Sequence, residues 1–192
     1  LLHVAPAVAK AAMDSGVAKR PLDDLKKYEH QLSEFVYQSG LLMRPVFNQA
    51  RKDLKRVVLA EGEDERVLRA VLTINSDRLA KPILIGRPDV VQSRIERIGI
   101  NLTIGEDFEL VNPQDDPRFY DYWTLYHKLM ERRGVSPEIA KAVVRTRTTV
   151  IAALMVKRGE ADAMLAGLNG RYHKVLQHII DVIGLKDQQP SS

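Results

Sequence analysis

Four short apolar runs dominate the pattern of the chain from residue 56 onward. Each run is rich in aliphatic residues and is followed by a turn and then by apolar positions spaced three and four residues apart. Short, continuously apolar strands that alternate with amphipathic helices are typical of a parallel sheet covered by helices on both faces. The predicted strands are residues 57–60, 82–85, 108–111 and 163–166.

Helices fill the intervals between these strands, and several carry signals for their starts. Residues 115–117, Asp-Asp-Pro, are predicted to start a long helix with an aromatic stripe at 119–126, which we expect to face the core. Ser136-Pro137-Glu138 begins another helix, and Thr149 is predicted to cap the next. Further helices are predicted around residues 68–72, 91–98 and 175–183.

The first 55 residues have a different pattern, with helices and no strand. A first helix ends at Gly16, where a left-handed residue is tolerated. Pro21 opens a second helix, whose apolar stripe continues to Gly40. An amphipathic helix is also predicted at residues 42–52.

The composition excludes several classes of protein. The 192 residues include no cysteine, which removes disulfides, thiolate metal sites and cysteine nucleophiles and fits a cytoplasmic protein. The longest apolar run, 150–156, is far shorter than the roughly 20 residues of a membrane span. The net charge is only +4, and basic pairs such as Arg132-Arg133 lie beside acids or at helix ends. We therefore expect neither a membrane nor a nucleic-acid partner.

Both ends of the sequence look like cuts in a longer polypeptide. The chain begins with Leu1, and the polar stretch 184–192 follows an apolar helix without a further element that would close a domain. We therefore expect a fragment of a larger protein.

Ligands of open parallel sheets bind beyond the carboxyl ends of the strands, so the turns there are the candidate sites. The first turn, 61–66, has four acids and one glycine, which is not a dinucleotide-binding pattern. Its acids either stabilise the start of a helix or face a ligand hydroxyl or amine. The second turn contains Gly86 and Arg87, and it is either a surface turn or a place where a guanidinium binds phosphate.

The fourth turn is the strongest candidate for contact with an anion or a pantetheine amide. Gly167 and Gly170 allow close approach of backbone N–H groups, and Arg171 and Tyr172 follow directly. The same glycines are also compatible with an ordinary turn. No metal site is predicted, because Asp115-Asp116 fits a helix start better than a ligand pair. The five histidines are scattered and are expected to be solvated, with only His173 next to a candidate turn.

Two parts of the sequence resemble known families. Residues 5–21 resemble the C-terminal end of bacterial malic enzymes. Residues 57–66, 81–86, 132–135 and 159–167 resemble the phosphate acetyl/butyryltransferase, or phosphotransacetylase, family. In this order they make the chain similar to the large hybrid NADP-dependent malic enzymes, which carry a phosphotransacetylase-like domain behind the malic enzyme domain.

The resemblance implies a three-layer α/β domain with a parallel sheet, similar to half of a phosphotransacetylase or isopropylmalate dehydrogenase-like domain and preceded by a short helical segment. It implies the end of a malic enzyme domain at 1–40, a linker helix at 41–55 and the N-terminal part of the phosphotransacetylase-like domain at 56–192. The NADP site and the Mg or Mn site of the parent enzyme would precede Leu1. We therefore expect no cofactor and no metal on this chain.

The resemblance also implies a regulatory role. Acetyl-CoA would bind in the cleft as a small-molecule allosteric effector, and the domain would support a homo-oligomer. Active phosphotransacetylases have two arginines at positions that are Met130 and Gln177 here, and losing them removes preorganised positive charge from a phosphoryl site. We therefore expect a catalytically silent domain, without catalytic residues, of an enzyme that oxidatively decarboxylates malate to pyruvate. The alternatives are an active phosphate acetyltransferase domain and a purely structural dimerisation module.

Overall fold

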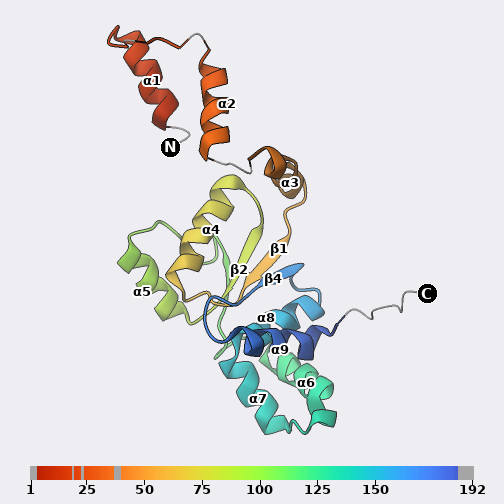
Figure 1. Ribbon diagram of the computed structural model, residues 1–192. Coiled ribbons are helices and arrows are strands. Elements are labelled where there is room, and N and C mark those ends of the chain that lie inside the picture. The colour runs from red at the N-terminus through yellow and green to blue at the C-terminus, as the bar shows by residue number, and fades with distance from the viewer. Residues whose placement is uncertain (1–3, 19, 23, 37–39, 186–192) are drawn as a thin grey trace, which may run out of the picture. The chain divides into compact units, whose positions relative to one another are not determined.

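The computed structural model describes residues 4–18, 20–22, 24–36 and 40–185. The chain divides into two compact units, Leu1–Lys52 and Asp53–Ser192 (Figure 1). Within the described residues, none of the helices is both long and apolar enough to cross a membrane.

The first unit consists of helices, as the sequence predicts. They are α1 (Val4–Asp14), α2 (Leu25–Val36) and α3 (Gly40–Lys52). Gly16 follows α1 with a φ of +73°, which agrees with its predicted role. The prediction that α2 begins at Pro21 is wrong: the Asp24 carboxylate accepts hydrogen bonds from the backbone N–H groups of Lys26 and Lys27, and this cap places the start at Leu25.

The end of α2 also differs from the sequence-based expectation. Gly40 is the first residue of α3 rather than the last residue of the second helix. The predicted helix at residues 42–52 is present within α3.

The second unit contains a four-stranded parallel sheet in the order β3-β2-β1-β4, which confirms the predicted fold class. In the register, Val58 of β1 lies between Ile83 of β2 and Met164 of β4, and Leu84 pairs with Leu110 of β3. The strands are β1 (Arg56–Leu59), β2 (Lys81–Ile85), β3 (Glu109–Val111) and β4 (Ala163–Leu165). Because the strands are parallel, their carboxyl ends and the turns that follow lie along one edge of the sheet.

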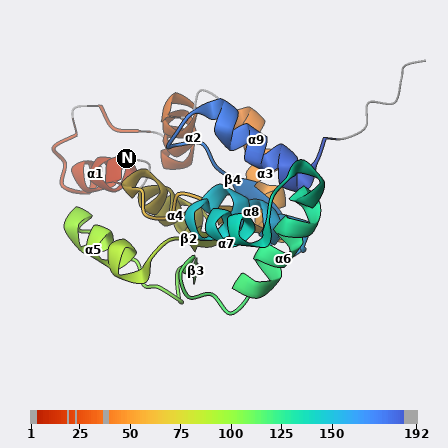
Figure 2. The ribbon, with the colours of Figure 1, turned by 90° about the horizontal axis from the view of Figure 1, so that it is seen from below.

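Helices cover both faces of this sheet and form three layers (Figures 1 and 2). One outer layer is made by two helices and the other by four, with a short 3-10 turn between α6 and α7. The first layer is α4 (Glu65–Asp77) and α5 (Pro88–Ile98); the second is α6 (Phe119–Met130), α7 (Pro137–Thr146), α8 (Thr148–Lys157) and α9 (Tyr172–Ile183).

Alternation along the strands divides the core between the two faces. Leu59 and Leu84 pack with α4 and α5, whereas Val58, Ile83 and other alternate residues pack with the second helical layer. In α8 every residue from 149 to 155 is buried, because this helix lies between the sheet and its neighbouring helices. The longest apolar run of the sequence, 150–156, therefore forms part of the larger core.

Two helix starts differ from the prediction. Thr149 does not cap α8, because the helix begins at Thr148 with Arg147 in the N-cap position, and Thr149 is buried in the first turn. The helix after Asp116-Pro117 begins at Phe119, and the Asp116 carboxylate accepts from the backbone N–H of Arg118. Ser136 does start α7, where its hydroxyl accepts from the N–H of Ile139.

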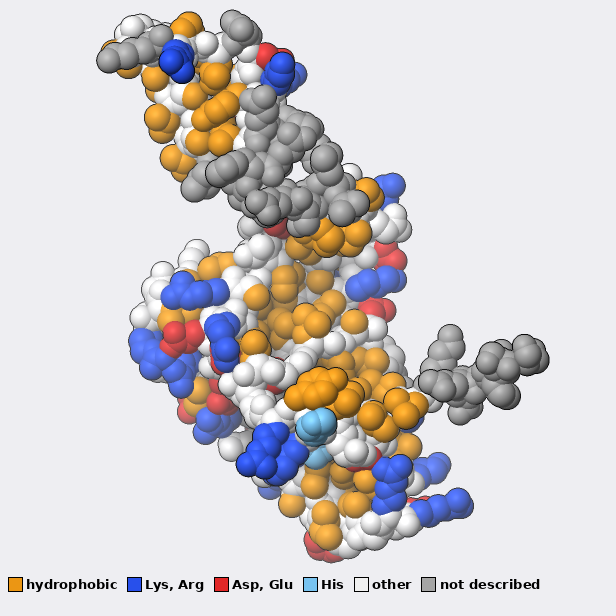
Figure 3. All heavy atoms as spheres, viewed as in Figure 1, with side chains coloured by type: hydrophobic (Ala, Val, Ile, Leu, Met, Phe, Trp, Pro, Cys, Tyr) orange, Lys and Arg blue, Asp and Glu red, His pale blue; other side chains and the backbone are white. Residues whose placement is uncertain are grey.

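The edge strand β4 leaves an apolar surface on the second unit. Its central residue, Met164, is half-buried, while Ala163 and Leu165 are exposed. Figure 3 shows hydrophobic side chains gathered over the region of β4 and α9. The exposed large residues of this region are Leu165, Leu168, Tyr172, Ile183 and Leu185. Exposed edge strands with apolar neighbours readily pair with another segment of chain. This apolar surface therefore differs in character from the polar turns nearby.

Candidate functional site

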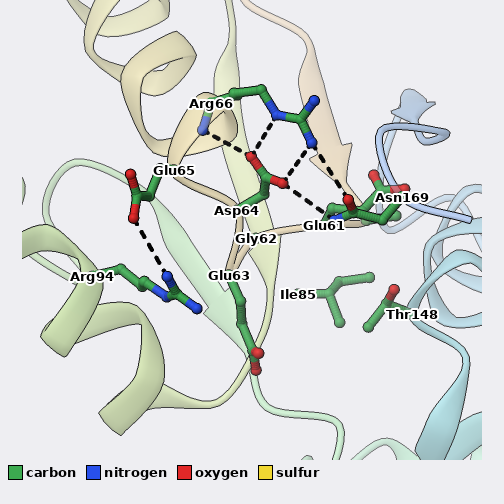
Figure 4. Close-up of a pocket in the computed structure, with 11 residues that line it drawn as sticks. Glu61, Gly62, Glu63, Asp64, Glu65, Arg66, Ile85, Arg94, Thr148 and Asn169 are labelled. Carbon is green, nitrogen blue, oxygen red and sulfur yellow. Dashed lines mark hydrogen bonds and ion pairs between the residues drawn. The ribbon is translucent and has the colours of Figure 1, made fainter. Parts of the chain in front are cut away.

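The turns after β1, β2 and β4 meet at the carboxyl edge of the sheet and enclose a cavity of about 610 Å³. Most of its lining comes from the β1–α4 turn, with additions from the end of β2, from α5, from the first residue of α8 and from the β4–α9 loop (Figure 4). The lining residues are Ala60, Glu61, Gly62, Glu63, Asp64, Glu65, Arg66, Ile85, Arg94, Thr148 and Asn169.

Glycine is required where the first two turns cross. The N–H of Gly62 donates to the carbonyl of Ile85 at 3.1 Å, and a Cβ on Gly62 would lie 2.8 Å from that carbonyl oxygen. A Cβ on Gly86 would lie 2.9 Å from Cγ of Glu63 and 3.1 Å from Cγ2 of Val91. Close packing of the turns therefore explains both glycines without any ligand.

Three of the four acids in the first turn pair with arginines. Asp64 is the N-cap of α4 and accepts from the backbone and the guanidinium of Arg66 at 2.8–2.9 Å. These hydrogen bonds from Arg66 hold the pKa of the Asp64 carboxyl far below its ordinary value. Glu65 pairs with Arg94 at 3.4 Å and also with Arg97.

Glu63 forms the third pair, with a candidate residue of the second turn. Both carboxylate oxygens of Glu63 accept from the guanidinium of Arg87 at 2.9 Å, and one also accepts from the Arg87 backbone N–H. The side-chain hydrogen bonds from Arg87 lower the pKa of Glu63. Arg87 therefore makes the forked contact expected of an anion-binding arginine, but with a carboxylate of its own chain.

Glu61 differs from the other acids of this turn. Its Oε1 accepts from the backbone N–H of Gly167 at 2.8 Å, and within the described residues it has no hydrogen bond to an arginine or lysine. Asp64 also accepts from the Asn169 side chain at 3.2 Å. The carboxylates after β1 thus hold the loop after β4, because these two strands are neighbours in the sheet.

None of the six candidate residues lines the cavity. Gly167 and Gly170 have φ values of +116° and +95°, so the loop uses the conformational freedom of both glycines. Arg171 occupies the N-cap position of α9, and Tyr172 begins the helix with 71% of its surface exposed and its ring edge-on to His173. Gly167 and Arg87 touch the cavity only through their partners Glu61 and Glu63.

Three lining residues escaped the sequence reasoning. Thr148, Arg94 and Asn169 belong to a helix start, the middle of a helix and a loop, and no local motif marks them as neighbours. Asn169 lies inside the fourth turn, and a polar side chain between two glycines could have marked it as a candidate. No local pattern marks Thr148, because its place at the cavity depends on how α8 packs against the sheet.

The positions at which active phosphotransacetylases were expected to have arginines lie in ordinary surroundings. Met130 is 7% exposed and belongs to the larger core. Gln177 donates to Asp181, which also pairs with Arg133. Neither position presents a cation to the cavity.

Two smaller expectations concern metal ligands and histidines. Asp116 binds the Arg118 guanidinium through both carboxylate oxygens, and the described residues contain no group of three acids or histidines that could hold a metal ion. The expectation of a solvated histidine is wrong for His178, whose Nδ1 is buried without a hydrogen-bond partner. Burial lowers the pKa of His178, and the nearby charge of Arg147 lowers it further.

The arrangement of the second unit defines a class of protein, the phosphotransacetylase-type α/β domains. The EutD phosphotransacetylase from Staphylococcus aureus superposes with a TM-score of 0.67 and 21% identity, over 76% of this chain and 43% of that one. The sequence profile of the phosphate acetyl/butaryl transferase family matches residues 41–191. The chain belongs to this family.

The resemblance to hybrid malic enzymes is confirmed as well. The chain is 52% identical over 187 residues to the NADP-dependent malic enzyme of Escherichia coli (strain K12), which is 97% of this chain and 25% of that protein. It is also 52% identical over 185 residues to the NAD-dependent malic enzyme of Rhizobium meliloti (strain 1021), covering 96% of this chain and 24% of that protein. The chain thus spans about a quarter of the length of these curated relatives.

Proposed function

We propose that this chain is the regulatory, phosphotransacetylase-like part of a cytoplasmic NADP-dependent malic enzyme. In this proposal it binds acetyl-CoA, supports a homo-oligomer and does not transfer acetyl groups, while malate is oxidatively decarboxylated elsewhere in the polypeptide. The observation that carries the proposal is that nearly the whole chain matches a segment of an NADP-dependent malic enzyme, and that this segment is a quarter of the enzyme's length.

The charges at the carboxyl edge support a silent domain. Transfer of an acetyl group to phosphate requires cations that stabilise phosphate and the developing charge. The two arginines that line the cavity, Arg66 and Arg94, already pair with Asp64 and Glu65. Met130 and Gln177 add no positive charge, and the Gly167 N–H already donates to the Glu61 carboxylate.

Acetyl-CoA binding is tested by calorimetric titration of the full-length enzyme. We expect Arg171→Ala and Tyr172→Ala to weaken binding about tenfold or more, the usual effect of losing a contact to a charged or aromatic group. Arg132→Ala, which removes an equal charge from the turn after α6, is the matched control. Unchanged affinity in the first two variants would remove these residues from the site.

An active phosphate acetyltransferase is the second candidate, and membership of the transferase family favours it. The discriminating assay measures acetyl phosphate formed from acetyl-CoA and phosphate. We expect no turnover above the background. A turnover of about 1–10³ per second, which is typical of enzymes, would replace the regulatory proposal with this one.

A further inference from the structure

Three exposed cations, Arg147, Arg171 and Lys174, lie at the starts of α8 and α9, and we call them the basic patch. Within residues 40–185, none of their side chains makes a hydrogen bond or an ion pair. By contrast, the two arginines that line the cavity, Arg66 and Arg94, pair with acids of the turn 61–66. Figure 3 shows basic side chains next to histidine in the region where α9 begins. The basic patch therefore carries positive charge that its own chain does not neutralise.

The charges of the basic patch are unfavourable for the helices that carry them. A helix N-terminus favours an acid, and α4, α5, α6 and α7 each have an Asp or Glu in the first turn. Neither α8 nor α9 has an acid there. Arg147 and Arg171 are their N-cap residues, and neither side chain makes a capping hydrogen bond. An anion bound at the patch would remove this unfavourable concentration of positive charge.

The two helix starts are close to each other and to the cavity. The helices α8 and α9 pack against each other. Thr148, the first residue of α8, lines the cavity, and so does Asn169, which lies two residues before Arg171. The two arginines of the basic patch are thus within two residues of the lining, although neither belongs to it.

A buried imidazole shows that the cations of the two helices converge. Burial is the main reason that the pKa of His178 is lowered, and the charges of Arg147 and Lys174 lower it further, so both cations lie near this side chain of α9. The Nδ1 of His178 is buried without a hydrogen-bond partner. Asp181 is the acid that acts on His178, and its carboxylate already pairs with Arg133. Asp181 is therefore not free to neutralise the basic patch.

We propose that the basic patch binds the phosphate groups of a ligand whose remaining part enters the cavity beside Thr148 and Asn169. Guanidinium groups match the geometry of phosphate, and an ammonium group adds a further positive charge. The identity of the ligand rests on the proposed function, in which the phosphates of acetyl-CoA lie on the patch and its acetylated arm lies in the cavity. This arrangement keeps the phosphates away from the acids of the turn 61–66, which would repel them. It adds Arg147 and Lys174 to the site.

The patch is tested by calorimetric titration of the full-length enzyme with inorganic pyrophosphate. Arg147→Ala and Lys174→Ala are each expected to weaken binding about tenfold, as for a lost hydrogen bond between charged groups. Arg132→Ala removes an equal, exposed charge from the turn after α6 and is the matched control, which should bind as the unsubstituted enzyme does. Absence of pyrophosphate binding, or equal binding by all of these proteins, would overturn the proposal.

Salt dependence separates a charge contact from a structural role of the same residue. The affinity for pyrophosphate is expected to fall as the ionic strength rises, and to fall less steeply in Arg147→Ala, where fewer charge contacts remain to be screened. Arg147→Lys keeps the charge and is expected to retain both the salt dependence and most of the affinity. Identical salt dependence in Arg147→Ala and the unsubstituted enzyme would show that this arginine does not contact the anion, and would overturn the proposal.

The variants keep the test decisive if one of them fails to fold. Should Arg147→Ala unfold, Lys174→Ala still tests the patch from the other helix. The pyrophosphate titrations do not involve acetyl-CoA. A failed acetyl-CoA titration of the full-length enzyme would therefore count against the proposed function, whereas acetyl-CoA binding that is indifferent to both Arg147→Ala and Lys174→Ala would count against the patch.

Discussion

Two charged clusters of the second unit use the same residue types in opposite ways. The turn cluster is Glu61, Glu63, Asp64 and Glu65 with their arginines at the carboxyl edge of the sheet. The Tyr122 cluster is partly buried and consists of Asp116, Arg118, Tyr122, Arg158 and Glu160, where the start of α6 meets the segment after α8. Arg118 also approaches Glu109 at the start of β3, which places this cluster towards the other edge of the sheet.

The Tyr122 cluster is organised around the phenol ring of Tyr122. The Tyr122 hydroxyl donates to Glu160 at 2.5 Å, and the guanidinium groups of Arg118 and Arg158 each lie 5.6 Å from its ring centre. Burial is the main reason that the pKa of Tyr122 is raised, and the Glu160 carboxylate raises it further. Glu160 joins Arg118 and Tyr122, at the start of α6, to Arg158 at the end of α8, so we assign the cluster to stability.

The turn cluster faces an open cavity. Its pairs join the turns after β1 and β2 through Glu63 and Arg87, and they join α4 to α5 through Glu65. Exposed ion pairs contribute little to stability because water screens them. Their effect is on geometry, since Arg87 joins the turns after β1 and β2, and Asp64 also holds Asn169 of the fourth turn. The comparison teaches that a similar set of charges stabilises the fold in one place and shapes a site in the other.

The largest expected effect comes from breaking the Tyr122 cluster. Glu160→Ala leaves the Tyr122 hydroxyl without its acceptor and removes a partner from both Arg118 and Arg158. We expect the free energy of unfolding to fall by about 2–3 kcal/mol, measured by urea denaturation. Glu106→Ala should change it by less than about 0.5 kcal/mol. A similar small loss in both variants would contradict the assigned role.

The next effect tests the packing of the turns. Gly62→Ala is expected to lower the free energy of unfolding by about 2 kcal/mol, because the new Cβ meets backbone atoms of β2. Gly86→Ala should lower it less, since its nearest obstacle is the flexible Glu63 side chain. The same denaturation experiment compares the two. The reverse order would show that the turns do not cross as described.

A smaller effect is expected from the phenol alone. Tyr122→Phe keeps the ring and its contacts with the two guanidinium groups but removes the hydrogen bond to Glu160. We expect a loss of about 1 kcal/mol, clearly less than in Glu160→Ala. Thermal unfolding of both variants checks this, and equal losses would mean that the arginines contribute nothing through Glu160.

The smallest effect concerns acid stability in the turn cluster. The pKa of Asp64 is lower in the folded protein than in the unfolded chain, where it is about 3.9. Asp64 therefore contributes to the free energy of unfolding above about pH 3.9, and this contribution is lost as the pH falls through the folded pKa. Asp64→Asn keeps a capping side chain but removes the charge. The urea midpoint of the Asp64→Asn variant should therefore decline less steeply between about pH 4 and pH 2 than that of the unsubstituted protein. Identical slopes would contradict the pairing with Arg66.

Local patterns were sufficient for the elements of the fold. Continuous apolar runs marked the four strands, and the aromatic stripe at 119–126 was expected to face the core, where Tyr122 and Tyr126 are buried. Errors occurred at helix ends, where side-chain capping and burial decide which residue comes first. Asp24 replaced Pro21 as the start of α2, and Thr149 was buried instead of capping α8.

The candidate site could be predicted only as a set of turns. Spacing along the chain located the glycines and acids, because backbone freedom and first-turn charges are local properties. The pairing of Glu63 with Arg87 and of Glu61 with Gly167 required the strand order that sets β1 between β2 and β4. Contacts between residues so distant in sequence depend on which strands become neighbours, and no short stretch of sequence encodes that choice.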